Sequence, residues 1–441
     1  MINFNFNENK KLALCLAVFL AFSLTSFFLP FFSTDEYGYM ASGMEIKEGT
    51  FANVGDINRF PLFPFMLSAV YSILGYSEFI TKLLMLVIGI LTIYIFHEKL
   101  AKPALGAEKA FLATLVFVSN PFFLYLSTRV LSEPLFFLLL ITGIFLLTKF
   151  ENVAYAFVFG IVSATLFLTR YIGVIILLVA ALFLLWKHKN VFAIPVKSVI
   201  CAVFGFVLAL LPWFWLSEQT TGSFFALALK FFSQQSVLNE ATFSLPDKIP
   251  FYLIFIPFLL LFATPLLWKG AADFYKRGIA SNKTLTLAGI TVVVFWLAME
   301  VYGVFNVALL RYIVPIIPFL ALFAGNVELP FKFAGFQINK KIFYSFIVLN
   351  LLIASGVFVF FASYPKYIGY KEAGQWAAEN CASINSNIQK VMEHYSGKYN
   401  SIPAQCTVIS GYDGALQPAD DQTLVFESHG VKIYNYFESK G

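Results

Sequence analysis

The stretch "LALCLAVFLAFSLTSFFLPFFSTDEYGYM" (residues 12–40) places a long apolar run directly before two adjacent carboxylates. The run exceeds the roughly 20 apolar residues that a transmembrane helix needs. Lys10 and Lys11 precede it, as in a signal peptide, but no small-residue cleavage site lies before Asp35. We therefore expect a retained first transmembrane helix. Asp35 and Glu36 would then lie where this helix reaches water.

The composition extends this interpretation to the whole chain. Of the 441 residues, 59% are hydrophobic and only 12% are charged, and the mean hydropathy is +0.78. A soluble protein would carry about twice that charged fraction. The sequence thus predicts a polytopic α-helical membrane protein that lies in the lipid bilayer. The net charge of +5 gives no indication of nucleic-acid binding; in such a chain, the placement of Lys and Arg reports orientation instead.

The apolar runs predict the number of spans and their orientation. About eleven transmembrane helices are expected, near residues 12–32, 78–97, 109–127, 131–149, 153–169, 171–186, 197–217, 250–268, 284–304, 308–324 and 342–363. The segment "FPLFPFMLSAVYSILG" (60–75) is short and holds two prolines, so it is either a twelfth span or an interfacial helix. If it does not span, the short loops on the N-terminal side hold most of the Lys and Arg residues. Because cytoplasmic loops collect these residues, we expect a multi-pass cell-membrane protein with a cytoplasmic N-terminus and an extracytoplasmic C-terminus.

This topology divides the chain into two domains. Residues 1–363 would form a transmembrane catalytic domain with outer loops at about 33–77 and 218–249. Residues 364–441 would form a small soluble extracytoplasmic α/β domain. Within it, "KEAGQWAAENC" (371–381) and "SNIQKVMEHY" (386–395) are typical of helices. Strands are expected at "CTVIS" (406–410), "TLVFES" (423–428) and "VKIYNYF" (431–437).

Two cysteines lie in this C-terminal region. Cys381 and Cys406 could form a disulfide if the domain faces an oxidising compartment. The alternative is a pair of ordinary buried thiols, and the sequence leaves both open.

The predicted topology brings scattered ionisable residues to one membrane face. They are Asp35, Glu36, Arg59, Arg129, Glu133, Arg170 and Arg311. Charge at the hydrocarbon edge is costly and usually has a partner or a task. Guanidinium groups bind phosphate oxygens in a bidentate manner, and a carboxylate can accept the proton of an attacking hydroxyl. Each residue also has a simpler interpretation: a helix cap at Asp35–Glu36, a snorkelling arginine, or an i,i+4 pair between Arg129 and Glu133.

Five motifs follow one another in order along roughly residues 10–325. They are Asp35-Glu36-Tyr37 after the first helix, Arg59 in "RFPLFPF", Arg129 and Glu133 in "TRVLSEP", Arg170 in "LTRYIG", and Arg311-Tyr312 in "RYIVPIIP". Their order and spacing resemble the polyprenyl-phosphate-sugar-dependent glycosyltransferases of the GT-C class. The resemblance extends in particular to the protein O-mannosyltransferase-like group and to bacterial relatives that add aminoarabinose to lipid A.

The resemblance implies an activity and, with the charge argument, a set of roles. The chain would transfer a sugar, with inversion, from a polyprenyl- or dolichyl-phosphate donor to a protein or glycolipid acceptor on the non-cytoplasmic face. Asp35 would be the general base, with Glu36 as the second catalytic acid. The donor phosphate would be bound by Arg59, Arg129, Arg170 and Arg311. Supporting roles fall to Tyr37, Glu133 and Tyr312.

The sequence departs from the aminoarabinose enzymes at Asn58-Arg59-Phe60-Pro61, where they have Glu-Lys-Pro-Pro. No further acidic cluster of the kind that holds a divalent ion in oligosaccharyltransferases is evident. We therefore expect an enzyme without a cofactor, while a metal ion at Asp35 or Glu36 stays open. The alternative functions are a secondary transporter or lipid flippase, which would place charges near the midplane and show internal repeats, and a non-catalytic scaffold.

Overall fold

A computed structural model describes most of the chain. The described residues are 6–29, 31, 34–49, 60–224, 256–305, 310–363, 365–396, 404–411, 416, 418 and 422–436. Arg59 and residues 225–249 of the predicted second outer loop lie outside them.

The described residues confirm a mostly helical chain with several membrane-spanning elements. Six helices are long and apolar enough to cross a bilayer. They are α1 (Phe6–Ser26), α4 (Glu78–Ile95) continued by the π-helical η2 (Phe96–Ala101) and α5 (Lys102–Leu105), α10 (Ile175–His188) preceded by η3 (Tyr171–Val174), α11 (Val196–Thr221), α15 (Lys283–Phe305) and α17 (Lys340–Ala362).

One further pair of apolar helices has the length of a span but is sharply bent, as in a broken span or a re-entrant loop. Helices α6 (Ala107–Val118) and α7 (Pro121–Ser127) are bent by 66° relative to each other. The cause lies in two adjacent residues. Pro121 cannot continue a helix from the preceding turn, and the Asn120 side chain caps the new helix by accepting from the amides of Phe122 and Phe123 at 3.0 and 3.2 Å. Such a side-chain cap fixes the start of a helix.

Shorter apolar helices complete the bundle. They are α3 (Leu62–Leu74), α8 (Ser132–Thr148), α9 (Val153–Thr169) and α16 (Ile317–Gly325), which follows η9 (Leu310–Tyr312) and η10 (Val314–Ile316). Every residue of α16 is buried, so this helix forms the centre of the core. A Cβ on Gly270 would lie 1.7 Å from the carbonyl oxygen of Phe323. The segment around Gly270 therefore packs very closely against α16.

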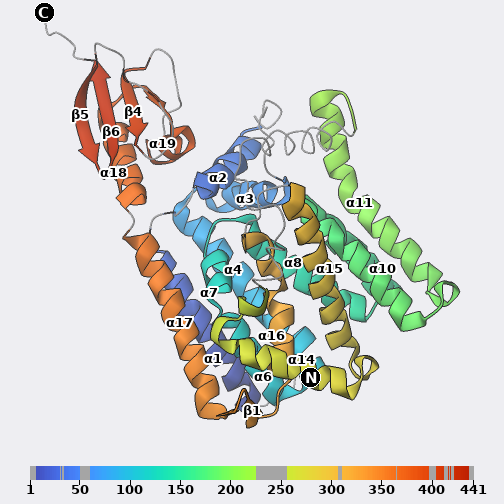
Figure 1. Cartoon of the computed structure of the whole chain (residues 1–441). Helices are drawn as coiled ribbons and strands as arrows, with labels where there is room; N and C mark the ends of the chain where they lie inside the picture. The colour runs from blue at the N-terminus through green and yellow to red at the C-terminus, as the bar shows by residue number, and fades with distance from the viewer. Residues whose placement is uncertain are drawn as a thin grey trace, which may run out of the picture.

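The predicted span near 250–268 takes a different form in its described part. Two short 3-10 turns, η6 (Ile256–Phe258) and η7 (Leu261–Ala263), lead into α14 (Thr264–Arg277), which lies across the lower end of the bundle (Figure 1). Pro257 and Pro265 explain the difference, because each removes a helical hydrogen bond and disfavours helix in the residue before it. The total of eleven spans stays a prediction.

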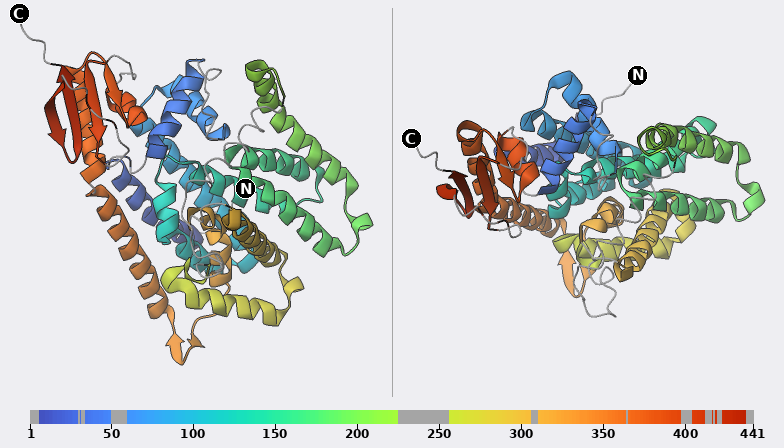
Figure 2. Two further views of the ribbon diagram at one scale, coloured as in Figure 1. Left: turned by 45° about the horizontal axis from the view of Figure 1, so that its top comes forward. Right: turned by 90° about the horizontal axis from the view of Figure 1, so that it is seen from above.

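The predicted segment 60–75 is the helix α3. Its 13 residues correspond to about 20 Å of helix, less than the roughly 30 Å of hydrocarbon to be crossed. It packs beside α2 (Thr34–Lys47) at the upper end of the bundle, near the C-terminal sheet (Figures 1 and 2). The hairpin β1 (Phe331–Phe333) and β2 (Phe336–Ile338) lies at the opposite end.

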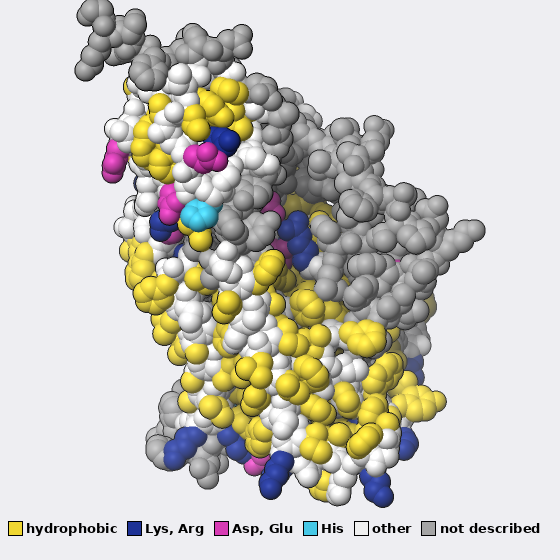
Figure 3. Space-filling model, turned by 60° about the vertical axis from the view of Figure 1, so that its left-hand side comes forward, with side chains coloured by type: hydrophobic (Ala, Val, Ile, Leu, Met, Phe, Trp, Pro, Cys, Tyr) yellow, Lys and Arg dark blue, Asp and Glu magenta, His cyan; other side chains and the backbone are white. Residues whose placement is uncertain are grey.

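The surface is consistent with a membrane environment. In Figure 3, hydrophobic side chains cover the middle of the visible face, and Lys and Arg side chains gather along its lower edge. Large apolar side chains on α11 and α17, such as Trp215 and Val359, are more than half exposed. This is the pattern expected where lipid rather than protein covers a helix.

The C-terminal region is a small α/β unit, as predicted. It contains α18 (Pro365–Asn380), β3 (Ile384–Ser386), α19 (Gln389–Ser396), β4 (Cys406–Ser410), β5 (Gln422–Ser428) and β6 (Val431–Tyr436). The sheet order is β3-β4-β6-β5, with β3 parallel to β4 and the other pairs antiparallel. The strand β3 was not predicted, because three residues are too few to show an alternating pattern.

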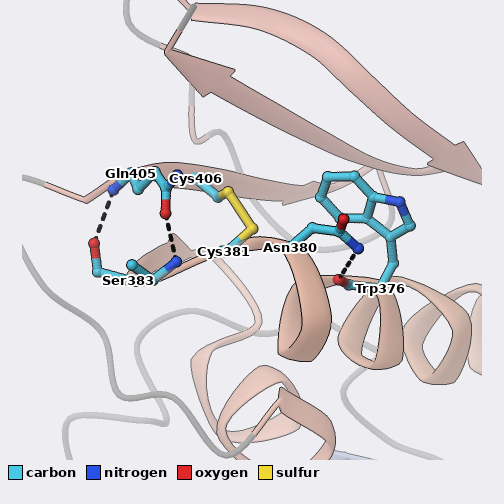
Figure 4. Close-up of a disulfide and its surroundings, with 7 residues drawn as sticks. Trp376, Asn380, Cys381, Ser383, Gln405 and Cys406 are labelled. Atoms are coloured by element: carbon cyan, nitrogen blue, oxygen red, sulfur yellow. Dashed lines mark hydrogen bonds between the residues drawn. A yellow bond between two sulfur atoms is a disulfide. The ribbon is translucent and has the colours of Figure 1, made fainter. Parts of the chain in front are cut away.

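A disulfide joins the end of α18 to the start of β4. Cys381 and Cys406 are bonded, with their Cα atoms 5.9 Å apart (Figure 4). Next to the bond, the amide of Cys406 donates to the carbonyl oxygen of Ser383 at 3.0 Å. Of the two alternatives that the sequence left open, the structure has the disulfide.

Replacing both bonded cysteines by serine should destabilise the C-terminal unit by about 3 kcal/mol, because the bond closes a loop and restricts the unfolded chain. Hydrogen exchange of peptides from β4 and β6 in the purified full chain measures this directly. The matched control is Cys201→Ser, since Cys201 is a free thiol. Equal exchange in the two variants would contradict the expectation.

Candidate functional site

The two adjacent carboxylates open a helix rather than close one. Helix α1 ends at Ser26, and Asp35 and Glu36 lie in the first turn of α2. The expectation that they end the first helix is therefore wrong. Acidic side chains are favourable at this position, since the helix N-terminus carries a partial positive charge. Consecutive helical residues point in different directions, and the two acids accordingly have different partners.

Glu36 is buried and paired with Arg129. Its Oε2 lies 2.5 Å from Nη2 of Arg129, and its Oε1 accepts from the amide of Val130 at 3.0 Å. The Arg129 guanidinium also donates to the Tyr125 hydroxyl. Burial disfavours the charged guanidinium, yet the Glu36 carboxylate beside it raises the pKa of Arg129 above its ordinary value. Arg129 pairs with Glu36 in this way, and not with Glu133 as the simpler interpretation held.

Glu133 pairs instead with Arg170. The guanidinium nitrogen Nη1 of Arg170 lies 2.7 Å from Oε1 of Glu133 and donates to the Ser132 hydroxyl at 3.2 Å. Arg170 follows the last residue of α9, and Glu133 lies in the first turn of α8. Tyr39 of α2 donates to the same Ser132 hydroxyl at 3.1 Å. This bond connects α2 to the ion pair between Glu133 and Arg170.

Asp35 pairs with Arg311, and this pair is open to solvent. Nη1 of Arg311 lies 3.2 Å from Oδ2 of Asp35, and their side chains are 39% and 41% exposed. By contrast, the side chains of Glu36 and Arg129 are 2% and 4% exposed. Nε of Arg311 has no hydrogen-bond partner among the described residues. Asp35 and Arg311 are therefore the pair from which a ligand could accept or donate hydrogen bonds.

Tyr312 connects the Glu133–Arg170 pair to the Asp35–Arg311 pair. Its ring lies 5.3 Å from Cζ of Arg170 and 5.5 Å from Cζ of Arg311, within the range of cation–π attraction. We call this set of residues the acid–arginine cluster; it comprises Asp35, Glu36, Arg129, Glu133, Arg170, Arg311 and Tyr312. The structure thus brings together the predicted residues from α2, the α7–α8 turn, α8, the end of α9 and η9.

Two predicted site residues remain. Arg59 lies outside the described residues; Phe60, which follows it, packs against Phe167 and Tyr171 with ring centres 5.6 and 6.2 Å apart. Tyr37 is fully buried, and its hydroxyl lies 2.8 Å from that of Tyr395 in the C-terminal unit. No three His, Cys, Asp or Glu side chains among the described residues are grouped closely enough to hold a metal ion, and the question of a metal at Asp35 stays open.

Sequence reasoning missed Tyr39 and Ser132. Tyr39 lies four residues after Asp35, so it occupies the same face of α2, and Ser132 lies inside the motif "TRVLSEP". Once α2 is known to be a helix, this spacing is a signal that could have identified Tyr39. No comparable signal pointed to Tyr395.

The fold was compared with known proteins. No family model matches the sequence, and no curated protein matches it. The structure is similar to that of ArnT from Cupriavidus metallidurans in the apo state, with a TM-score of 0.71, 14% identity, and coverage of 96% of this chain and 97% of that one. ArnT bound to undecaprenyl phosphate gives a TM-score of 0.69 at 13% identity, covering 97% and 98%.

A more distant similarity links the chain to a second transferase. The apo oligosaccharyltransferase of Archaeoglobus fulgidus gives a TM-score of 0.53 at 12% identity, over 91% of this chain and 65% of that one.

Replacing Glu36 by Gln should lower the free energy of unfolding of the purified protein by about 3–5 kcal/mol, because Arg129 would stay charged and buried without its counter-charge. Asp35→Asn is the matched control. It removes a half-exposed ion pair, which contributes at most about 1 kcal/mol. Thermal unfolding in detergent compares the two, and equal stability losses would contradict this division into a buried and an open pair.

The similarity to ArnT covers nearly the whole length of both chains and includes the small C-terminal sheet unit as well as the helices. The chain therefore has the same overall fold as ArnT.

Proposed function

We propose that the protein transfers a sugar from a polyprenyl-phosphate-linked donor to an acceptor on the non-cytoplasmic side of the membrane. The single observation that carries this proposal is the open Asp35–Arg311 pair within a cluster whose other ion pairs are more deeply buried. The fold supports it, because ArnT has been solved with undecaprenyl phosphate bound. The order of the five motifs supports it independently.

The chemistry assigned to Asp35 is that of a general base. Its carboxylate accepts the proton of an acceptor hydroxyl or amine while that atom attacks the anomeric carbon of the sugar. The bond between the anomeric carbon and the phosphate oxygen breaks, and the lipid phosphate leaves with the electron pair. Attack from the side opposite the leaving phosphate inverts the anomeric centre, in keeping with a single displacement step.

The phosphate leaves with an added negative charge, which Arg311 is suited to stabilise. Its side chain is half-exposed, as is that of its partner Asp35. Guanidinium groups remain charged at low dielectric and match phosphate geometry. Arg129 and Arg170 already bind buried carboxylates. We therefore assign the main phosphate contact to Arg311. Arg129 and Arg170 would contribute positive potential around the phosphate and hold the helices in place.

The proposed orientation places the C-terminal unit outside the cytoplasm. The Cys381–Cys406 disulfide supports this, because such bonds persist in oxidising compartments. The lysine-rich loops support it as well.

Asp35→Asn should reduce sugar transfer by about 10²–10⁴-fold, the usual contribution of a general base, without loss of folded protein. The assay combines purified full chain in liposomes with a panel of radiolabelled polyprenyl-phosphate sugars and bacterial membrane acceptors. Substantial remaining transfer would exclude Asp35 as the base. Movement of an unchanged labelled compound across the bilayer would instead favour a transporter or flippase.

Arg311→Gln should weaken binding of undecaprenyl phosphate by about tenfold to a hundredfold, the value of a charged hydrogen bond. Binding can be measured by competition with a labelled lipid phosphate in detergent. Lys341→Gln is the control, because this exposed lysine lies on α17 at the opposite end of the molecule. Equal affinities of the two variants would remove Arg311 from the phosphate site.

A further inference from the structure

The C-terminal unit contacts the first turn of α2, which carries Asp35 and Glu36. Helix α19 packs against α2, and Figures 1 and 2 show it between the sheet and the two upper helices. At the contact, the hydroxyls of Tyr37 and Tyr395 lie 2.8 Å apart. Their rings meet edge to face, with centres 5.5 Å apart. Tyr37 directly follows Asp35 and Glu36 in the chain, so this contact lies within one turn of the proposed base.

His394 extends the same contact to the start of α4. Its Nε2 lies 2.9 Å from Oε1 of Glu78, and its Nδ1 lies 2.5 Å from the Tyr76 hydroxyl. The His394 ring also packs edge to face on Tyr37, at 5.2 Å. One turn of α19 is thereby joined to two separate elements of the transmembrane domain.

The rest of α2 is held from another side. A Cβ on Gly43 would lie 2.8 Å from Cβ of Leu67 on α3, so the middle of α2 is fixed closely against α3. The first turn, with the acids, is held by two buried side chains. Glu36 pairs with Arg129, and Tyr37 bonds to Tyr395 of the C-terminal unit. Asp35 itself is half-exposed, so Tyr37 is the second anchor for the backbone that carries it.

The two tyrosines stay neutral. Burial raises the pKa of Tyr37 well above its ordinary value, and it does the same for Tyr395. Their bond is therefore a neutral hydrogen bond between two hydroxyls over the physiological pH range. A buried hydroxyl that loses its partner is costly, whereas loss of both hydroxyls is nearly neutral.

We propose that Tyr395 of the C-terminal unit is a positioning residue that fixes Asp35 through Tyr37. The inference rests on the proposed function, since it assumes that Asp35 is the base. A carboxylate that is displaced by even a fraction of an ångström from an attacking hydroxyl loses much of its effect. On this view the C-terminal unit completes the reaction centre without contacting the reacting atoms.

The test is a cycle of three variants: Tyr37→Phe, Tyr395→Phe and the double variant. Each single variant removes the hydrogen bond between the two hydroxyls, so we expect kcat to fall by about tenfold with KM for the lipid-linked donor unchanged, together with a lower melting temperature. The double variant should regain the melting temperature of the wild type, because loss of both hydroxyls is nearly neutral for stability, but not its kcat, because the bond is still absent. Tyr434→Phe, on β6 of the same unit, is the control and should match the wild type.

Deuterium uptake of the peptide that covers α2 gives a readout that does not require activity. Uptake should rise in all three variants, because each of them lacks the bond between the two hydroxyls. Single variants with wild-type kcat and uptake would overturn the proposal. So would a parallel loss of kcat and melting temperature in all three variants, because the contact would then be merely structural.

Failure of the proposed function gives a different result. In that case the wild-type protein transfers no sugar from any donor in the panel, or Asp35→Asn is fully active. The proposal that Tyr395 positions the base then fails as well, regardless of the deuterium uptake of α2.

Discussion

The acid–arginine cluster depends on one buried ion pair, that between Glu36 and Arg129. Two charges removed from water are stabilised when they neutralise each other at close range and form further hydrogen bonds. Here Oε1 of Glu36 accepts from a backbone amide, and Arg129 donates to Tyr125. The pair ties α2 to the turn between α7 and α8. The pair therefore helps to fix the turn that carries the neighbouring Asp35, whose own partner is the half-exposed Arg311.

Much of the fold and of the site was predictable because both depend on local patterns. Long apolar runs predicted most helices, and the topology inferred from them predicted that charged residues distant in sequence gather at one end, as the described ones among them do. The partners of those residues were not predictable. Arg129 and Glu133 have the spacing of a helical pair, but a turn separates Arg129 from α8, so Arg129 meets Glu36 instead. Pairings of this kind are set by tertiary packing, which a single sequence does not record.

The differences in the helices have a similar origin. Hydropathy measures how apolar a segment is, and it does not register the effect of Pro257 and Pro265 on the backbone. In its described part, the expected span near 250–268 therefore consists of two 3-10 turns followed by α14.

The chain shares only 14% of its residues with apo ArnT, at a TM-score of 0.71. Apolar residues can replace one another in lipid-facing and core positions at little cost, so such a fold can persist where the sequence no longer reveals it.

The contact between Tyr37 and Tyr395 joins residues that are 358 positions apart in the sequence. A ribosome makes α2 well before α19, and domains generally fold as they emerge. Tyr37 therefore lacks its contact with Tyr395 until the intervening helices and α19 have been synthesised. Because α19 lies in the loop closed by the disulfide, oxidative folding of the C-terminal unit is coupled to completion of this contact on α2.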